Sequence, residues 1–277
     1  MVDKGCVLLD TDLMENQADL VHYDVHDGVA VLTLNDPPAN TYSHEMMRRL
    51  DECVLQARFD PEVHVLVLRG MGEKFFCAGA NIGMLEKADP YYKYYFCLHA
   101  NETLNRLEHT PKLVLAALNG HAVGGGLEIA MAADLRIACA GSAKIGMPEV
   151  QLGVLPGTGG TQRLARLVGK ARAIELLVEG RNLSVVEARD LGLVNHVFDK
   201  EGFFDQVMEY ARGFCPPAKA ALAVGRIKRS VQSGLEMSFD SSLTLERELQ
   251  QQLFQSEDAR EGLAAYLEKR TPRFQGR

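Results

Sequence analysis

The segment G-H-A-V-G-G-G-L-E-I-A-M-A-A-D, residues 120–134, places three consecutive glycines directly before a run of helix-forming residues. Glycine has no Cβ, so a ligand can approach its backbone closely. The first N–H groups of a helix have no partner within the helix and carry a partial positive charge. The turn at Gly124 to Gly126 can therefore aim a backbone N–H at a developing negative oxygen. A tight strand-to-helix turn that binds no ligand would show the same pattern.

Two carboxylates occur in apolar company beside small-residue loops. Glu128 follows the glycines of the first segment, and Glu149 lies in K-I-G-M-P-E-V-Q-L at 144–152. A second small-residue loop is F-F-C-A-G-A-N at 75–81. Burial raises the pKa of a carboxyl, and a second carboxyl nearby raises one of the pair further, so that one acts as an acid and the other as a base. This equipment suits adding water to a double bond conjugated to a carbonyl, and it equally suits moving a proton beside one.

The order of elements predicts a β/α core followed by a mostly helical tail. Residues 20–34 predict two strands joined at Asp27-Gly28. The glycine loop 157–160 has neither G-K-[ST] nor G-x-G-x-x-G, and we interpret it as a loop that leads into a helix from Thr161. Strands are expected at 63–70, 113–120 and 134–139, and helices at 43–58, 203–213, 218–233, 238–256 and 257–269. We divide the chain into a flexible leader (1–18), a core (19–204) and a helical region (205–277).

Composition narrows the class of protein. The 277 residues are 47% hydrophobic and carry a net charge of −7, which disfavours a nucleic-acid-binding protein. Six cysteines without a C-x-x-C pair are typical of reduced thiols in a cytoplasmic protein. The acidic N-terminus fits neither a secretory signal nor a mitochondrial presequence, and no apolar run is long enough for a membrane helix. His22 and His26 share a strand face but lack a third metal ligand nearby.

Three motifs together resemble those of the crotonase superfamily, and within it the enoyl-CoA hydratases. They agree in order and spacing, and they read H-A-V-G-G-G-L-E-I-A-M-A-A-D, F-C-A-G-A-N and M-P-E-V-Q-L-G-V-L-P-G-T-G-G-T-Q-R-L. The likeness extends from about residue 20 to the C-terminus and includes A-Y-L-E-K-R at 265–270. It implies an α/β fold with a crotonase-type spiral of ββα turns and a C-terminal helical trimerisation region. The implied assembly is a homotrimer or a hexamer made of two trimers.

The resemblance also implies roles for individual residues. Glu128 would hold the water, Glu149 would exchange the α-proton, and Ala78 and Gly125 would donate N–H groups to the thioester oxygen. The implied reaction is hydration of a trans-2-enoyl-CoA to a 3-hydroxyacyl-CoA in fatty-acid β-oxidation, with coenzyme A as part of the substrate and no metal or other cofactor. The implied substrate-binding residues are Ala39, Ala78, Gly79, Ala80, Asn81, Ile82, Gly125, Gly157, whose N–H can contact the water, and Lys269, which a neighbouring subunit can lend.

Several alternatives remain open at this point. An isomerase that shifts the double bond of a 3-enoyl-CoA would usually keep only the glutamate that matches Glu149, and other acyl-CoA reactions occur in the superfamily. RNA binding would need more cations than G-R-I-K-R at 225–229 supplies. A Cys77 nucleophile with His121 as base lacks an orienting group. Asn81 stands where many relatives have Asp, and the aromatic stretch at 91–96 leaves the acyl group undetermined.

Overall fold

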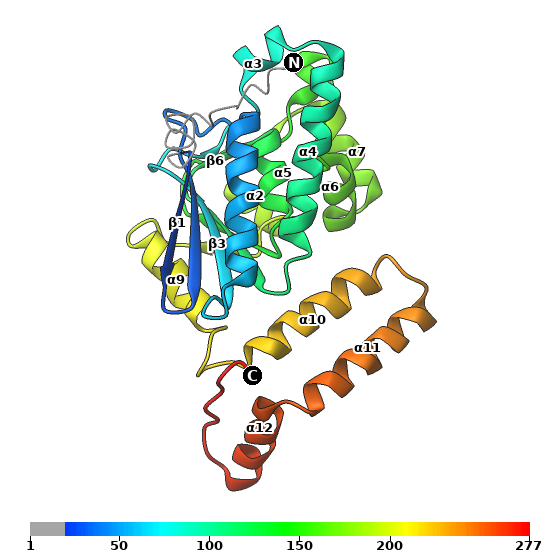
Figure 1. Cartoon of the computed structure of the whole chain (residues 1–277). Coiled ribbons are helices and arrows are strands. Elements are labelled where there is room, and N and C mark those ends of the chain that lie inside the picture. Colours follow the sequence, from blue (N-terminus) through cyan, green and yellow to red (C-terminus); the bar gives the residue numbers. More distant parts are fainter. Residues whose placement is uncertain (1–19) are drawn as a thin grey trace, which may run out of the picture.

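A computed structural model describes residues 20–277 (Figure 1), and the leader predicted at 1–18 lies outside these residues. The described chain begins with a hairpin in which β1 (Val21–His26) pairs antiparallel with β2 (Val29–Leu34). The turn residues Asp27 and Gly28 have φ values of 50° and 81°, the left-handed conformation that an Asp-Gly turn favours. The predicted hairpin is therefore confirmed.

From β3 to β8 the chain contributes strands alternately to two sheets, and β9 and β10 then add one strand to each. The six-stranded sheet has the order β1-β2-β3-β5-β7-β10, and every pair after the hairpin is parallel. The four-stranded sheet has the order β4-β6-β8-β9. Each spiral turn thus gives a long strand to the first sheet and a short strand to the second. The strands are β3 (Val65–Gly70), β4 (Phe75–Cys77), β5 (Leu113–Leu118), β6 (His121–Val123), β7 (Leu135–Cys139), β8 (Ile145–Gly146), β9 (Asn182–Leu183) and β10 (His196–Phe198).

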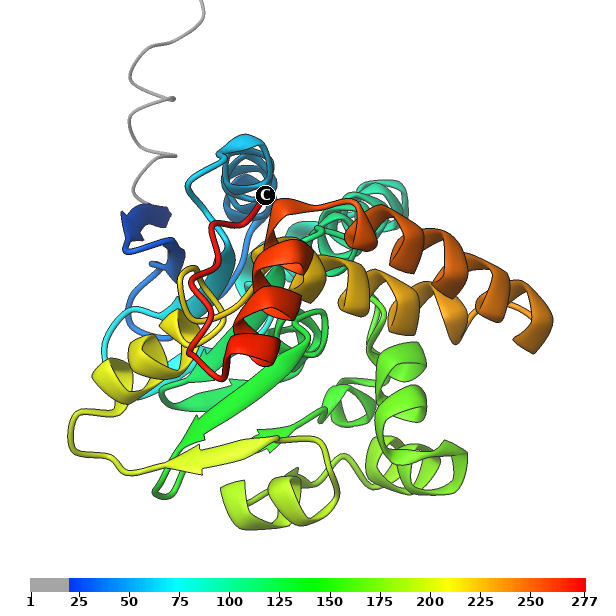
Figure 2. The same cartoon turned by 90° about the horizontal axis from the view of Figure 1, so that it is seen from below.

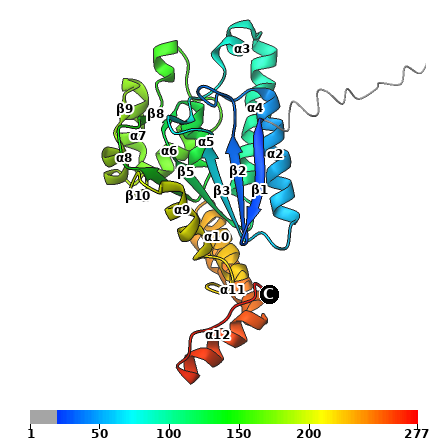
Figure 3. The same cartoon turned by 90° about the vertical axis from the view of Figure 1, so that its left-hand side faces the viewer.

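The large sheet is buried on both faces because its strands alternate apolar side chains between two cores. Leu32 and Leu66 face the core that contains α2 (His44–Phe59) and α4 (Pro90–Glu108). Val31 and Val67 face the core formed by α9 (Phe203–Arg212). Figure 3 shows the sheet between α2 and α4 on one side and α9 on the other.

The remaining helices of the core connect the strands or pack around the small sheet. The Ser43 side chain caps α2 as the sequence predicts, by accepting a hydrogen bond from the Met46 N–H. The predicted helix from Thr161 is confirmed and begins one residue earlier. The helices that connect the strands or pack around the small sheet are α3 (Ile82–Lys87), α5 (Gly125–Met131), α6 (Gly160–Val168), α7 (Lys170–Glu179), α8 (Val185–Asp190) and the 3₁₀ helix η1 (Glu149–Leu152).

Only part of the helical region leaves the core. α9 packs on the chain's own sheet through Phe203, Val207 and Ala211, so the helix at the start of the predicted tail belongs structurally to the core. The next three helices, α10 (Ala221–Gly234), α11 (Phe239–Phe254) and α12 (Glu257–Glu268), extend away from it, as Figures 1 and 2 show. No helix in residues 20–277 is long and apolar enough to cross a membrane.

Candidate active site

The glycine turn at 124–126 exposes the N–H of Gly125. Gly124 has φ 57° and ψ −132°, a backbone conformation that L side chains rarely adopt, and its N–H donates to the Gly146 carbonyl at 2.8 Å. Gly125 is the first residue of α5, so its N–H has no partner within the helix. The loop at 75–81 lies directly against this group, since a Cβ on Gly79 would come within 3.2 Å of the Gly125 nitrogen. The two small-residue segments predicted from the sequence therefore meet.

The structure changes which N–H of the 75–81 loop can act as a donor. The Ala78 N–H donates to the Ala39 carbonyl at 3.0 Å, so it is already used within the protein. Tyr42 N–H donates to the Gly79 carbonyl and Asn81 N–H donates to the Tyr42 carbonyl, both at 3.0 Å. In this short parallel pairing the N–H of Ala80 faces away from Tyr42. No hydrogen bond among residues 20–277 uses the Ala80 N–H, so the structure supports Ala80 as the donor and does not support Ala78.

Glu128 is buried and firmly held. Its Oε1 accepts hydrogen bonds from the N–H groups of Thr158 at 2.8 Å and Gly160 at 2.7 Å. Its Oε2 accepts a short hydrogen bond from the Thr158 hydroxyl. A carboxylate offers about four acceptor positions, so these bonds occupy both positions on Oε1 and one on Oε2. No other hydrogen bond of the described residues uses the remaining position on Oε2.

Glu149 lies beside the same turn but is held quite differently. β8 runs next to β6, and this places the Glu149 carboxyl against Gly124, where a Cβ would come within 3.1 Å of Oε1. The other oxygen, Oε2, is buried and has no hydrogen-bond partner among the described residues. Burial is the main cause that raises the pKa of Glu149 to about 7, and the charge of Glu128 adds to it. Glu149 can therefore take up and release a proton near neutral pH.

The loop at 157–160 that binds Glu128 is fixed from behind by α4 and α6. Asn101 donates through its amide to the Gly157 carbonyl at 3.3 Å. The Arg163 guanidinium donates to the Thr158 carbonyl at 3.2 Å and also forms an ion pair with Glu108 at 2.7 Å. The site therefore has one glutamate that is fixed in place and one that can exchange a proton. Two backbone N–H groups lie beside them.

The sequence pattern of the enoyl-CoA hydratase/isomerase family matches residues 24–277. The chain belongs to this family. A short-chain-enoyl-CoA hydratase of Clostridium acetobutylicum is 38% identical over 243 residues, covering 87% of this chain and 92% of the relative. A crotonyl-CoA hydratase of Syntrophomonas wolfei is 37% identical over 247 residues, covering 89% and 94%. The crystal structure of an enoyl-CoA hydratase from Geobacillus kaustophilus HTA426 superposes with a TM-score of 0.91 at 43% identity, covering 94% of this chain and 97% of that one.

Family membership confirms the crotonase-type fold expected from the motifs. The predicted residues Ala39, Gly79, Asn81 and Ile82 all belong to the loop around Ala80 or to the backbone bonded to it. The Asn81 side chain caps α3 by accepting from the Met84 N–H at 3.0 Å. An aspartate could cap the helix in the same way, so the Asn81 side chain serves this structural role without a charge.

Two other predicted positions stand apart from this loop. Gly157 lies on the Glu128 side of the site, where a Cβ would come within 3.0 Å of Cys97 Sγ. Lys269 ends α12 in the protruding tail, and a single chain does not bring it to the loop that leads into α3 (Figure 1). Lys269 could therefore contact a substrate in this site only if it belonged to another subunit.

The aromatic stretch divides into two groups. Phe96 is buried, whereas Tyr91 and Tyr94 are 73% and 65% exposed. The Phe96 ring packs on Tyr42. In residues 20–277 the only aromatic ring that contacts Tyr91 is that of Tyr95. The inner part of this stretch thus packs on Tyr42, while Tyr91 and Tyr94 are open to solvent.

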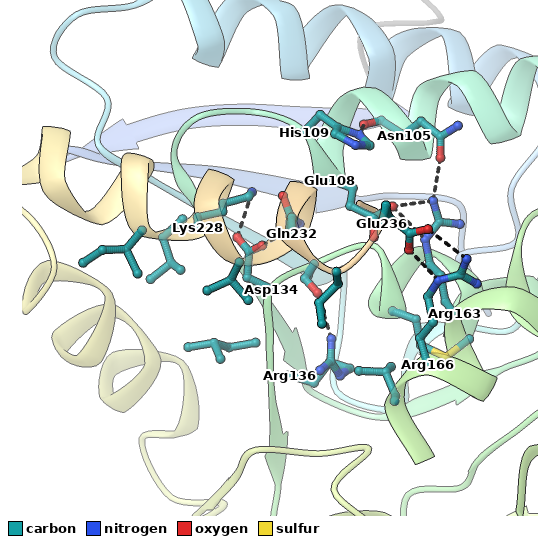
Figure 4. Close-up of a pocket in the computed structure, with 18 of the residues that line it drawn as sticks. Asn105, Glu108, His109, Asp134, Arg136, Arg163, Arg166, Lys228, Gln232 and Glu236 are labelled. Atoms are coloured by element: carbon teal, nitrogen blue, oxygen red, sulfur yellow. Dashed lines mark hydrogen bonds and ion pairs between the residues drawn. The ribbon is translucent and has the colours of Figure 1, made fainter. Parts of the chain in front are cut away.

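A separate cavity of about 910 Å³ lies behind the 157–160 loop, between the core and α10. Figure 4 shows its charged residues turned toward one another. They form ion pairs between Arg163 and Glu108, Arg166 and Glu236, and Lys228 and Asp134. The lining residues do not include Glu128 or Glu149, so this cavity is distinct from the candidate active site.

The other chemistries considered from the sequence find little support. Cys77 is fully buried, and burial raises the pKa of its thiol to about 12, so a thiolate nucleophile is disfavoured. The Nδ1 atom of His121 accepts from the Lys144 N–H at 2.8 Å, which occupies the proposed base. Lys228 of the basic stretch at 225–229 is buried against Asp134, which leaves fewer cations for a nucleic acid. No group of three or more His, Cys, Asp or Glu residues in the described chain is arranged to hold a metal ion.

Two contributors to the site were not predicted from the sequence. The Thr158 hydroxyl binds Glu128 Oε2, and a hydroxyl between glycines in P-G-T-G-G is the sequence signal that could have indicated this role. The Tyr42 ring lies against Gly125, and nothing near it in A-N-T-Y-S indicates this contact.

Proposed function

We propose that the protein hydrates trans-2-enoyl-CoA thioesters to 3-hydroxyacyl-CoA. The observation that carries this proposal is the presence of two glutamates with different environments beside two available backbone N–H groups. Glu128 is held as an acceptor by three donors, and Glu149 has a pKa of about 7. Hydration needs these two functions at once, because a base must take a proton from water while an acid gives one to carbon.

The thioester oxygen would bind between the N–H groups of Gly125 and Ala80. As the β-carbon is attacked, electrons move onto this oxygen and an enolate-like charge develops there. Two fixed backbone donors stabilise that charge without having to reorient. The positive end of α5, which begins at Gly125, favours the same charge.

The proton balance follows from the two glutamates. Water bound at the remaining acceptor position of Glu128 Oε2 gives its proton to Glu128 as its oxygen bonds to the β-carbon. Protonated Glu149 gives its proton to the α-carbon, which completes the 3-hydroxyacyl product. Glu128 is then protonated and Glu149 is ionised, so Glu128 must lose a proton and Glu149 must regain one through solvent before the next turnover. Gly157, whose N–H is used by no hydrogen bond of the described residues, can help to hold the water. The coenzyme A moiety leaves the site unchanged, and the chemistry needs no electron transfer.

The substrate class we propose is a short acyl chain. Tyr42 and Phe96 stack with ring centroids 5.7 Å apart and fill space next to Gly125. The two relatives described above are named for short-chain-enoyl-CoA and crotonyl-CoA hydration. Crotonyl-CoA is therefore the first substrate to test.

We also propose that the active assembly is a homotrimer or hexamer in the cytoplasm. α10 and α11 expose apolar side chains that the chain does not cover itself, among them Leu222, Ile227, Val231, Leu235 and Phe239. Burying such faces between subunits is favourable at about 25 cal/mol per Å² of apolar surface. A neighbouring subunit would then supply Lys269 to the phosphates of coenzyme A.

The proposal is tested by loss of the conjugated thioester absorbance when the protein is added to crotonyl-CoA and to longer 2-enoyl-CoA thioesters. Matched samples of 3-enoyl-CoA test the isomerase reaction, for which Glu149 alone would suffice. Hydration that is strongest with crotonyl-CoA supports the proposal. Turnover of 3-enoyl-CoA without hydration at any chain length would assign the protein as an isomerase instead.

A further inference from the structure

The loop that binds Glu128 is built mainly from glycine. The donors to Glu128 come from Thr158 and Gly160. Glycine occupies three of the four positions of the 157–160 loop, and Gly159 has a φ of 104°, in the left-handed region. Glycine has more backbone freedom than other residues, so such a loop does not by itself keep its N–H groups aimed at a carboxylate. Contacts on the side away from the carboxylate have to supply the alignment.

The peptide groups of this loop connect its two sides. They are trans, and in a trans peptide group the N–H and the carbonyl point in opposite directions. The N–H groups of Thr158 and Gly160 point at Glu128. The carbonyls of the same two peptide groups belong to Gly157 and Gly159, and they are therefore turned away from Glu128. Contacts that hold the carbonyls behind the loop thus hold the donors in front of it.

Every carbonyl of the three peptide groups has a partner behind the loop. The Gly157 carbonyl accepts from the Asn101 amide at 3.3 Å. The Gly159 carbonyl accepts from the backbone N–H of Arg163 at 2.9 Å, an ordinary bond at the start of α6 that any residue except proline would make. The carbonyl of the middle group, that of Thr158, accepts from the Arg163 guanidinium at 3.2 Å. The middle group therefore depends on the Arg163 side chain.

The guanidinium of Arg163 is itself held firmly. The residue is 8% exposed, and its Nη2 donates to Asn105 Oδ1 at 2.8 Å and to Glu108 Oε2 at 2.7 Å, as Figure 4 shows. Its Nε also donates to Glu108 Oε2, at 3.1 Å. A Cβ on Gly159 would overlap the guanidinium, so this group fills the space beside that glycine. The side chain thus fastens the loop to α4.

The other reacting groups of the site are held by different contacts. Glu149 begins η1, and the Gln151 side chain in η1 donates to the Gly180 carbonyl at the end of α7, at 3.1 Å. No hydrogen bond among residues 20–277 joins the loop that binds Glu128 to Glu149 or to Gly125. A disturbance of this loop should therefore affect Glu128 and leave the other two groups in place.

We propose that Arg163 is a positioning residue that acts through the Thr158 carbonyl to keep the donors of the loop on Glu128 and so to orient Glu128 Oε2 toward the reacting water. The inference rests on the proposed hydratase function and deepens it. Arg163 forms no hydrogen bond or ion pair with Glu128 in the described chain, and it moves no proton in this scheme. Changing it should impair the step that uses Glu128 and spare the step that uses Glu149.

Arg163→Lys tests the side chain with little change in charge or size. A lysine keeps the positive charge but has one ammonium in place of the planar fork, so it cannot bind Glu108 and the Thr158 carbonyl in the same geometry. The carboxylate is the stronger partner for the ammonium. Arg166→Lys is the matched control, because Arg166 lies one turn further along α6, pairs with Glu236 and forms no bond with the loop.

Two reactions are measured on the same samples at the same pH. Hydration of crotonyl-CoA uses both glutamates. Exchange of the α-proton of the saturated butyryl-CoA in deuterated water uses Glu149 and the two backbone N–H groups only. Arg163→Lys should lower kcat for hydration about tenfold, the factor for one charge-assisted hydrogen bond, with KM little changed. Its exchange rate, and both rates of Arg166→Lys, should stay within about twofold of the wild type. Unfolded protein lowers both rates equally, so their ratio reports on the folded molecules alone.

Thr158 variants place the effect on the proposed route. Thr158→Val removes the hydroxyl donor to Glu128 Oε2 and should lower hydration with the same sparing of exchange. Thr158→Ser keeps the hydroxyl and should retain most of the hydration. The loss in the double variant Arg163→Lys with Thr158→Val should be smaller than the product of the two single losses, because residues that act through one another are not additive.

The outcomes separate this inference from the proposed function. If the wild-type protein hydrates crotonyl-CoA and Arg163→Lys hydrates it as fast as Arg166→Lys does, the positioning role is overturned and the function stands. Equal losses of hydration and exchange in Arg163→Lys would also overturn it, since the residue would then act on groups that both reactions share. A wild-type protein that exchanges the α-proton but hydrates no 2-enoyl-CoA would overturn both.

Discussion

Ionisation of Glu149 should limit hydration on the alkaline side. Its pKa is raised to about 7, mainly by burial and further by the charge of Glu128. With this pKa, about 90% of the molecules carry the proton at pH 6 and about 10% carry it at pH 8. Hydration consumes the protonated form, so kcat/KM should fall about tenfold for each pH unit above 7. The overall reaction neither releases nor takes up a proton, so its equilibrium constant does not depend on pH. The kcat/KM for dehydration of the product must therefore fall in the same way above pH 7.

The same ionisation should weaken the folded state. The pKa of Glu149 is higher in the folded chain than its ordinary value of 4.5, so the folded state binds the proton more tightly. The stability gained in this way is fully present below about pH 4.5 and is lost as the pH rises through about 7. A pKa change of this size corresponds to about 3 kcal/mol. Because Glu149 is only partly buried, we expect about 1 to 2 kcal/mol after allowing for solvent screening.

The assay measures hydration of crotonyl-CoA and dehydration of 3-hydroxybutyryl-CoA between about pH 5 and about pH 9. Denaturant unfolding of the wild type and of Glu149→Gln is measured over the same pH range. Because the glutamine does not ionise, the difference between their free energies of unfolding reports the contribution of Glu149 ionisation. The wild type should lose stability relative to Glu149→Gln as the pH rises. A kcat/KM for hydration that stays constant up to pH 9, together with a constant stability difference, would refute the assigned environment of Glu149.

Further predictions concern Glu128, the tail and its cations. Glu128→Gln should lower turnover at least about 100-fold while a binding titration with a saturated acyl-CoA stays near the wild-type value; near-native turnover would remove Glu128 from the chemistry. Lys228→Ala should destabilise the protein by about 3 kcal/mol in denaturant unfolding, because Asp134 stays buried without its partner at 2.8 Å; Lys219→Ala, at a less buried lysine, is the control. Lys269→Ala should raise KM for the CoA thioester and leave kcat nearly unchanged, and an unchanged KM at low salt would contradict its role. Light scattering should give three or six times the chain mass of 30.5 kDa, and a single-chain mass at micromolar concentration would contradict the proposed assembly.

The parts of the fold that local sequence determines were predicted well. The Asp27-Gly28 turn, the Ser43 cap and the helices α10, α11 and α12 depend on residues close together in the chain. None of the four short strands of the small sheet is predicted from the sequence, because two or three residues carry no clear alternation. The place of α9 was also missed, since an apolar helix face reads the same whether it packs on its own sheet or on another subunit.

In the candidate site, too, some features depend on local sequence and others on contacts between distant parts of the chain. The two glutamates and the glycine turn can be proposed from the sequence because carboxylates in apolar sequence and three glycines before a helix are local signals. The choice between Ala78 and Ala80 was not, because it depends on hydrogen bonds to Ala39 and Tyr42, which lie far away in the chain. A backbone donor has no side-chain signature, so only the three-dimensional pairing reveals which N–H is already used.

The positions of these groups along the chain have a practical consequence for engineering. Every residue assigned to the acid, the base and the two backbone donors lies between residues 80 and 149, whereas α10 begins at Ala221. The proposed chemistry and the proposed assembly thus use separate stretches of the chain. A chimera that keeps this chain through α9 and takes its last three helices from a relative would exchange the quaternary partner and the donated lysine. The proton-transfer machinery would remain that of the original enzyme.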